Sequence, residues 1–221
     1  MFAPKKLLAA TALIFLGVSN ASANLITNGD FETGSFAGWT TFVTNNGTAG
    51  HDIRIGPSDS HSASFHVGEL LHDITQQGGG ITQSFTSGTG EISISVDIFA
   101  STEGDGSFFS NSEGGVFQLL LDSLVIDTMS FGNMLGEETK SSNLSFFGSV
   151  SAGLHELTIL ITRPYTTNPW TPNQFVDNVL VQGPAPSTGG QVPEPASALL
   201  LGAGLSAMAL LRRRRNTGRA S

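Results

Sequence analysis

The stretch Glu91–Ala100, with the sequence EISISVDIFA, carries the clearest pattern in the chain. Isoleucine or valine stands at every even position from 92 to 98, and the positions between them carry Ser, Ser and Asp. A period of two places the apolar side chains on one face of an extended strand and the polar ones on the other. This stretch therefore predicts a β-strand with one buried face and one solvent-facing face.

Nine further short runs of the same character lie on either side of this strand, and residues 24–182 show no helical periodicity. Turn-forming groups such as Gly78–Gly80 and Ser87–Gly90 separate them. Many short strands with frequent turns predict an all-β fold, an antiparallel β-sandwich of the jelly-roll kind. The nine runs are Thr40–Thr44, Asp52–Ile55, Ser62–Val67, Ile81–Thr86, Val116–Leu121, Leu124–Met129, Leu144–Val150, Leu154–Thr162 and Phe175–Val181.

Charge is distributed unevenly along the 221 residues. The whole chain has a net charge of −8, but residues 24–192 hold 17 acidic and three basic residues, a net charge of −14. So acidic a segment argues against nucleic acid as a partner, because phosphate binding needs clustered lysine and arginine. The absence of cysteine excludes disulfides, thiolate metal sites and a cysteine nucleophile.

The N-terminus has the three parts of a secretory signal peptide. Lys5 and Lys6 precede an apolar run from Leu7 to Val18, and the small residues Ala21–Ala23 follow it. The run is shorter than the roughly 20 residues of a membrane span. We therefore expect the general secretion machinery to export the chain and signal peptidase to cut between Ala23 and Asn24. Residues 24–182 then form the exported domain.

The C-terminus contains a second ordered set of elements. A Pro/Gly/Ser/Thr-rich linker at 183–192 precedes a Pro-Glu-Pro tripeptide, an apolar stretch at 196–211, an arginine cluster and a short tail at 216–221. The positive-inside rule places the arginines in the cytoplasm, which predicts a helix in the inner membrane with the acidic domain outside. The elements that define this end are Pro193, Glu194, Pro195, Arg212, Arg213, Arg214 and Arg215.

This C-terminal arrangement resembles the PEP-CTERM sorting signal. In proteins with that signal, an exosortase in the inner membrane processes the chain. The resemblance implies that exosortase is a partner and that the protein ends in the cell envelope, on the surface or outside the cell. Because such proteins come from bacteria that make extracellular polysaccharide, it also implies an association with that polysaccharide or a biofilm.

The exported domain carries a second resemblance. Leu25–Gly34 followed by Gly38-Trp39, then Ile81–Phe85, then Phe175–Val179 are similar to the opening, early and final strands of galactose-binding-like jelly rolls, the fold of many carbohydrate-binding modules. The three pieces occur in the order of that fold. The resemblance implies the fold more directly than it implies a function.

The same resemblance implies a structural calcium site, because the first and last strands of that fold lie close together. Asp30, Glu32 and Asp177 are the candidate ligands, and carboxylate oxygens suit Ca²⁺. The alternative is a solvated turn in which Asp30 accepts hydrogen bonds from nearby backbone N–H groups.

Two aromatic residues are candidates for ligand contact. Tyr165 and Trp170 stand in a proline-flanked loop between the last two predicted strands, and flat rings stack on the C–H faces of sugars. The alternative is a tryptophan that covers one edge of the sandwich.

We expect a non-catalytic exported protein. A glycan-binding module with a specific ligand and a glycan-active enzyme with a carboxylate pair are the alternatives.

Overall fold

The computed structural model describes residues 24–44, 49–67, 77–102, 112–163 and 172–186. The chain divides into two units, residues 1–185 and residues 186–221. The described residues belong to the first unit, apart from Pro186. The predicted signal peptide and the sorting elements at 193–215 lie outside the described residues.

The described residues form β-strands and connecting segments. Each of the ten predicted runs is a strand. Two further strands of two residues each, β6 and β9, pair with each other in a small separate sheet. The strands are β1 Thr40–Val43, β2 Ala49–Ile55, β3 His61–Val67, β4 Gln77–Ser87, β5 Gly90–Ser101, β6 Ser112–Glu113, β7 Val116–Leu121, β8 Leu124–Ser130, β9 Asn133–Met134, β10 Thr139–Val150, β11 Gly153–Arg163 and β12 Asn173–Gln182.

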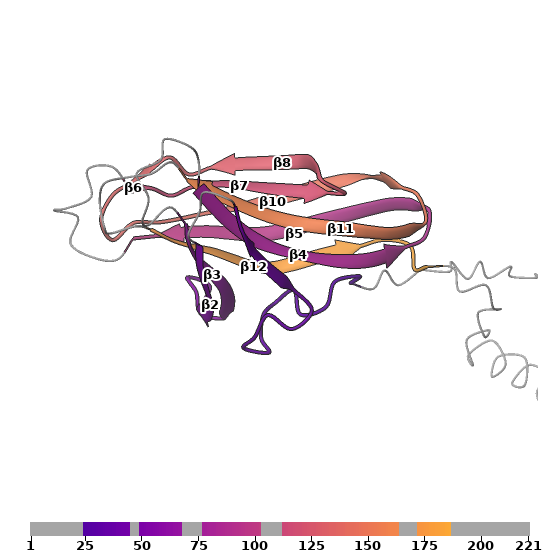
Figure 1. The fold of residues 1–221 in the computed structure, drawn as a ribbon, viewed down its shortest axis with the longest axis horizontal. Helices are drawn as coiled ribbons and strands as arrows, with labels where there is room; N and C mark the ends of the chain where they lie inside the picture. The colour runs from indigo at the N-terminus through magenta and orange to yellow at the C-terminus, as the bar shows by residue number, and fades with distance from the viewer. Residues whose placement is uncertain (1–23, 45–48, 68–76, 103–111, 164–171, 187–221) are drawn as a thin grey trace, which may run out of the picture. The chain divides into compact units, whose positions relative to one another are not determined.

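Two five-stranded antiparallel sheets pack face to face, as Figure 1 shows. Sheet I has the order β1-β4-β11-β7-β8, and sheet II has the order β10-β5-β12-β3-β2. The chain passes from one sheet to the other between β1 and β2, on both sides of β4, between β5 and β7, between β8 and β10, and on both sides of β11. The all-β antiparallel sandwich predicted from the sequence is confirmed.

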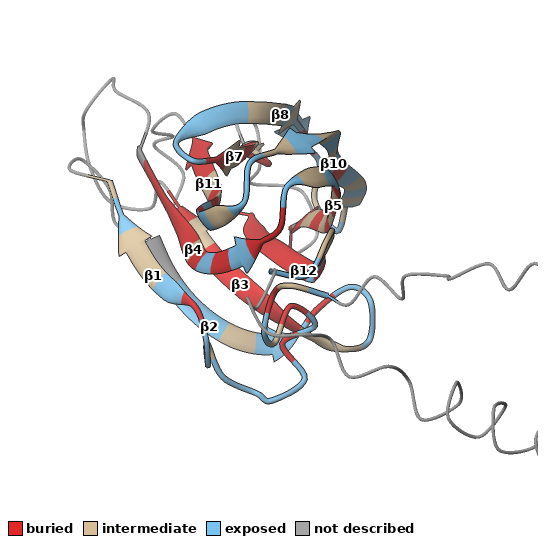
Figure 2. Cartoon of the chain, turned by 90° about the vertical axis from the view of Figure 1, so that its right-hand side faces the viewer, coloured by how far each residue is buried: buried red, intermediate tan, exposed pale blue. Residues whose placement is uncertain are grey.

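The core lies between the sheets. The even-numbered residues of β5 from Ile92 to Ile98 are at most 2% exposed, so the alternation in the sequence marks the buried face correctly. Figure 2 shows the buried residues gathered where the two sheets face one another. Burial of each such side chain contributes about 1.5–3 kcal/mol. Their partners from sheet I include Ile81, Phe117, Leu119, Leu157, Ile159 and Ile161.

The glycine run at 78–80 is not the turn that the sequence predicts. It lies inside β4, which pairs with β11 along this stretch. A Cβ at Gly78 would collide with the backbone oxygen of Ile161, and one at Gly80 with that of Ile159. Glycine therefore serves here to allow the two backbones to approach closely, rather than to reverse the chain.

Both ends of the described domain meet at one end of the sandwich. Asn24 forms a bridge with Gln182, and the Leu25 N–H donates to the Val181 carbonyl at 2.8 Å. The Gly88 N–H in the β4–β5 turn donates to the Pro184 carbonyl at 2.8 Å. The first residues of the predicted linker thus pack on the domain.

Within the described ranges, no helix has the length and apolar character needed to cross a membrane. The stretch at 196–211, for which the sequence predicts such a helix, lies outside those ranges.

Candidate functional site

The outward face of sheet II carries polar side chains in register across all five strands. Asn143 of β10 pairs with Asp97 of β5, which pairs with Asp177 of β12. Ser62 of β3 contacts Asp177, and Arg54 of β2 pairs with Ser62. We call this line of five side chains the polar row. It brings together residues that are up to 123 positions apart in the chain.

Hydrogen bonds connect the middle of the polar row. Asn143 Nδ2 donates to Asp97 Oδ1 at 2.9 Å, and Asn178 Nδ2 donates to Asp97 Oδ2 at 3.0 Å. Asn178 has a φ of 49°, and the pairing between β12 and β5 shifts register between Asp177 and Leu180. Asparagine tolerates this left-handed backbone better than most residues, and the bulge lets Asn178 reach Asp97.

Asp177 is 1% exposed and is satisfied by hydroxyl groups. Its Oδ2 accepts hydrogen bonds from Ser58, Ser60 and Ser62 at 2.9, 2.9 and 3.0 Å. Its Oδ1 accepts one from the Asn178 N–H at 2.7 Å. A buried carboxylate needs such partners, because its desolvation is costly without them. Asp177 therefore ties the β2–β3 turn to β12.

The three candidate calcium ligands have separate partners. The two oxygens of Glu32 contact the backbone N–H and the Nδ1 of His61 at 2.9 and 3.3 Å. Asp30 Oδ1 accepts a hydrogen bond from the Glu32 N–H at 3.4 Å, which fits the solvated-turn alternative. Across the described ranges, no group of three or more acidic, histidine or cysteine side chains could hold a metal. The expected cluster of Asp30, Glu32 and Asp177 is thus not formed there, and calcium binding stays a prediction.

Two phenylalanines form the next line of this face. Phe99 of β5 pairs with Phe175 of β12, which pairs with Ser64 of β3. Phe175 is 6% exposed, while Phe99 is half-buried and keeps part of its ring accessible. An apolar surface therefore lies directly beside the polar row.

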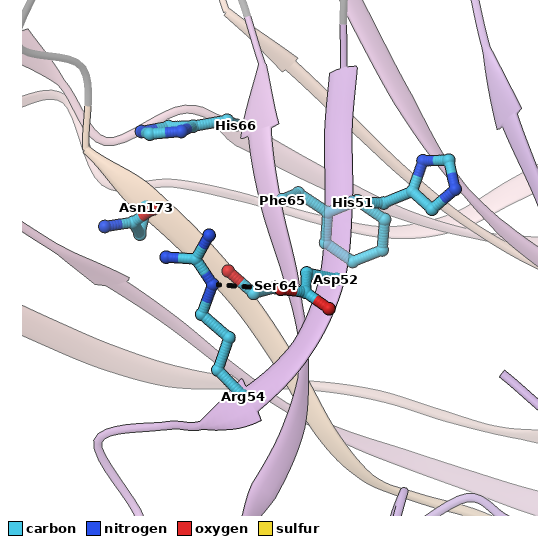
Figure 3. A pocket seen from close by; sticks show the side chains of 7 residues that line it. All are labelled: His51, Asp52, Arg54, Ser64, Phe65, His66 and Asn173. Atoms are coloured by element: carbon cyan, nitrogen blue, oxygen red, sulfur yellow. Dashed lines mark ion pairs between the residues drawn. The ribbon is translucent and has the colours of Figure 1, made fainter. Parts of the chain in front are cut away.

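A pocket of about 240 Å³ opens on the same sheet where β2, β3 and β12 meet. Figure 3 shows Arg54 extending toward Asn173 across this pocket, with Asp52 beside Arg54. Arg54 Nε lies 3.8 Å from Asp52 Oδ2, and Arg54 remains 47% exposed. We call this the Asn173 pocket. Its lining residues are His51, Asp52, Arg54, Ser64, Phe65, His66 and Asn173.

Asn173 is the unusual member of this pocket. It is 6% exposed, yet its Oδ1 has no hydrogen-bond partner. Buried side-chain oxygens in folded proteins nearly always have a partner, so an exception calls for an explanation. The next residue, Gln174, points the other way and is fully satisfied by Val67, Gly114 and Pro172.

A second pocket of about 300 Å³ lies beside the first described residue. It is lined by Asn24, Asn28, Gly29, Asp30, Asn178, Val179 and Leu180. The Asn24 side chain already accepts hydrogen bonds from the N–H groups of Ile26 and Val181 at 3.1 and 3.0 Å. This pocket therefore surrounds the segment at Asn24, which hydrogen bonds already hold against β12.

One ionisable pair lies away from both pockets, near the β7–β8 turn. His155 Nδ1 lies 2.8 Å from Asp122 Oδ2, and its Nε2 lies 3.0 Å from the Ser151 carbonyl. The Asp122 hydrogen bond raises the pKa of His155 above its ordinary value, against the opposing effect of burial. Burial alone would raise the pKa of Asp122, but hydrogen bonds from His155 and the Glu156 N–H, with the charge of His155, lower it.

The two aromatic residues that the sequence offers as ligand contacts, Tyr165 and Trp170, lie outside the described residues. The sequence patterns do not identify four residues of this face: Arg54, Asp97, Asn143 and Asn173. The sequence does hold a signal for Asp97, since it is an outward position of the Glu91–Ala100 strand. The sequence held no comparable signal for Asn173, because its lack of a partner depends on neighbours from other strands.

Solved structures similar to this domain include several carbohydrate-binding domains. TmCBM61, solved in complex with beta-1,4-galactotriose, matches with a TM-score of 0.48 at 14% identity, over 72% of this chain and 98% of that one. TmCBM27, described in terms of specific mannan recognition, has a TM-score of 0.45 at 14% identity, with coverage of 73% and 95%. The K1 cleaved adhesin domain of Lys-gingipain from Porphyromonas gingivalis W83 has a TM-score of 0.46 at 10% identity, with coverage of 70% and 95%.

No curated protein sequence matches the chain. A family model does match at the C-terminus: the PEP-CTERM protein-sorting motif covers residues 191–215. The match spans the predicted tripeptide, apolar stretch and arginine cluster, so that resemblance is confirmed. The motif implies export, a transient membrane anchor and processing by an exosortase. The chain is thus a β-sandwich that carries a PEP-CTERM protein-sorting motif.

Proposed function

We propose that this exported protein binds an extracellular glycan through the outward face of sheet II, in the cell envelope or in the polysaccharide matrix around the cell. The observation that carries the proposal is the polar row beside Phe99. In a domain that the sorting motif marks for export, one face offers amide, carboxylate and guanidinium groups next to an accessible aromatic ring.

The chemistry of these side chains suits a sugar. Amides and carboxylates are planar groups with two hydrogen-bonding atoms each, so one side chain can contact two neighbouring hydroxyls. Asn143 and Asp97 supply such groups, and the ring of Phe99 offers a surface for the C–H face of a sugar. An open sheet face also suits a polysaccharide, because a long chain can lie across it without threading an end into a closed cavity.

Tyr165 and Trp170 remain candidate contacts under this proposal. Their loop connects Arg163, the last residue of β11, to the start of β12. Trp170 stands three positions before Asn173 in the sequence. We expect Trp170→Ala to weaken glycan binding without lowering the melting temperature. A large fall in the melting temperature would instead identify Trp170 as a core residue.

The test of the proposal is a glycan array probed with the exported protein, followed by titration of any glycan that binds. Binding to at least one polysaccharide, including that of the producing organism, is the expected result. Absence of binding to every glycan on the array and to the organism's own polysaccharide would reject the proposal.

A non-catalytic role is part of the same proposal. A carboxylate pair on this face could in principle hydrolyse a glycosidic bond, so the glycan-active enzyme is the alternative. We expect no new reducing ends when the protein is incubated with the glycans that it binds. Their appearance, lost in an Asp97→Asn variant, would establish the enzyme instead.

The proposed route of export has its own test. Pro193-Glu194-Pro195 is proposed as the element that exosortase reads, because two prolines exclude a helix and present one carboxylate between them. Replacement of all three by alanine should leave an unprocessed form in the membrane fraction. Normal processing of that variant would remove exosortase from the list of partners.

A further inference from the structure

We infer that the Asn173 pocket is a subsite for one neutral sugar ring that presents two adjacent hydroxyl groups. One hydroxyl donates a hydrogen bond to Asn173 Oδ1, and its neighbour accepts one from the Arg54 guanidinium. This inference rests on the proposed glycan binding and names the place and the class of sugar.

Asn173 holds a hydrogen-bond acceptor that has no donor. Asn173 is 6% exposed and its Oδ1 has no partner in the protein. A buried polar atom without a partner costs about 1–3 kcal/mol. Pairing with Ser101 on β5 fixes the backbone of Asn173 in the strand, beside the pocket that its side chain lines. A ligand hydroxyl would supply the missing hydrogen bond.

Arg54 brings hydrogen-bond donors to the same pocket. Arg54 is one of three basic residues between positions 24 and 192. Its 3.8 Å approach to Asp52 is an ion pair longer than a hydrogen bond, and its guanidinium is half-exposed toward the pocket. A guanidinium has five N–H donors in a fixed plane, a geometry that suits oxygen atoms. The pocket therefore presents a donor across from the acceptor.

The charges around the pocket favour a neutral sugar. Asp52 compensates Arg54, and the polar row beyond them contains the carboxylates of Asp97 and Asp177. The pocket thus offers no excess positive charge within a segment of net charge −14. Such a field repels anions, so uronic acid and sulfated polymers are disfavoured relative to neutral ones.

Size favours a single ring. The volume of about 240 Å³ lies below the roughly 300–1,000 Å³ of sites that enclose a drug-sized ligand. The pocket is therefore suited to one sugar unit of a chain whose other units lie along the open face.

The experiment is calorimetric titration of the exported protein with neutral polymers (galactan, xylan and mannan) and with acidic ones (alginate and polygalacturonate). We expect binding to at least one neutral polymer and at least tenfold weaker binding to both acidic ones. Asn173→Ala and Arg54→Ala should each weaken the neutral interaction by about tenfold or more, because each removes one directed hydrogen bond. Asn133→Ala, an exposed asparagine on β9 outside the pocket, is the matched control and should bind as the parent does.

Melting curves of all four proteins separate a binding role from a structural one. Asn173→Ala should melt within a few degrees of the parent, because its Oδ1 supports no other group. Equal affinity in the parent, Asn173→Ala and Arg54→Ala would overturn the subsite while leaving glycan binding intact. Tighter binding to alginate than to any neutral polymer would overturn the neutral assignment. Failure of the parent to bind any polymer would instead reject the proposed function itself.

Discussion

The outward faces of the two sheets share the same alternation but differ in chemistry. Sheet II presents the polar row with its carboxylates and Arg54. On the outward positions of β4, β7 and β11 in sheet I, the one charged side chain within the described ranges is Glu156. A line of Thr40, Thr82 and Thr158 crosses that face, and Thr158 Oγ1 donates to Thr82 Oγ1 at 3.1 Å.

This difference shows what a period of two does and does not determine. Alternation requires that outward residues tolerate water, and threonine and aspartate both satisfy that requirement. The buried aspartate of sheet II, Asp177, goes beyond that requirement, because a buried carboxylate must be satisfied by specific partners. The outward face of sheet II therefore carries side chains whose positions are fixed by specific hydrogen bonds, beyond what solubility requires.

The largest difference between the faces should appear in stability. Asp177→Ala removes the acceptor of three serine hydroxyls, of which that of Ser62 is fully buried. We expect a loss of about 2–3 kcal/mol in the free energy of unfolding, measured by denaturant titration. For a domain of this size that corresponds to a fall in Tm of roughly 5–10 °C.

Thr158→Ala on sheet I is the control for that measurement. It removes one half-exposed hydrogen bond, and we expect a loss of about 1 kcal/mol or less. Equal losses in the two variants would show that the polar row contributes no more to stability than an ordinary strand surface.

The second largest difference between the two faces should appear in glycan affinity. Phe99→Ala is expected to weaken glycan affinity about tenfold, because the ring is the accessible apolar surface beside the polar row. Leu160→Ala, a half-buried residue on the outward face of sheet I, should leave affinity unchanged. Equal weakening of glycan binding by Leu160→Ala and Phe99→Ala would show that binding is not confined to the outward face of sheet II.

A smaller effect concerns pH and the pair of His155 and Asp122. The raised pKa of His155 gives stability that is complete below its unfolded value of about 6.5 and is lost as pH rises through the folded value. The lowered pKa of Asp122 gives stability that is present above 3.8 and is lost as pH falls through the folded value. The pair therefore stabilises the fold most between about pH 4 and 6.5.

His155→Gln should flatten this dependence in a series of melting curves from pH 4 to pH 9. An unchanged pH profile in the variant would show that other groups set the dependence. Because the pair lies near the β7–β8 turn, glycan affinity should follow the same pH course in the variant and the parent.

The smallest expected effect is that of calcium. Glu32 and Asp177 already have hydrogen-bond partners, which a calcium ion would have to displace. Calcium binding at these residues should therefore raise the melting temperature only slightly, by about 2 °C in calcium relative to magnesium at matched ionic strength. A calcium-specific rise that Asp177→Ala abolishes would establish the site that the sequence predicts.

The sequence predicts the fold well because strand periodicity is a local property. Every predicted run is a strand, since each carries its own pattern of apolar and polar residues. The error at Gly78–Gly80 has a physical cause: glycine favours turns by default, and a strand tolerates three of them only where a neighbour comes close. That neighbour, β11, lies some 80 residues further along the chain and is invisible to a local pattern.

The candidate site is less predictable because it depends on register between distant strands. The motif around Asp177 predicts a calcium ligand there, whereas its partners in the structure are three serines near residue 60, in a Ser-rich turn that carries no such pattern. Asn173 and Arg54 face one pocket only because β12, β3 and β2 are neighbours. No spacing in the sequence encodes that arrangement.

The bridge between Asn24 and Gln182 makes the sandwich a self-contained module. The described chain enters and leaves the domain at the same place, where Pro184 also contacts the β4–β5 turn. Domains with adjacent ends can be inserted into a loop of another protein or fused at either end with little disturbance. Joining the two ends and opening the chain at the Asp122–Ser123 turn should therefore give a circular permutant with the same fold, in which the sorting motif could be attached elsewhere.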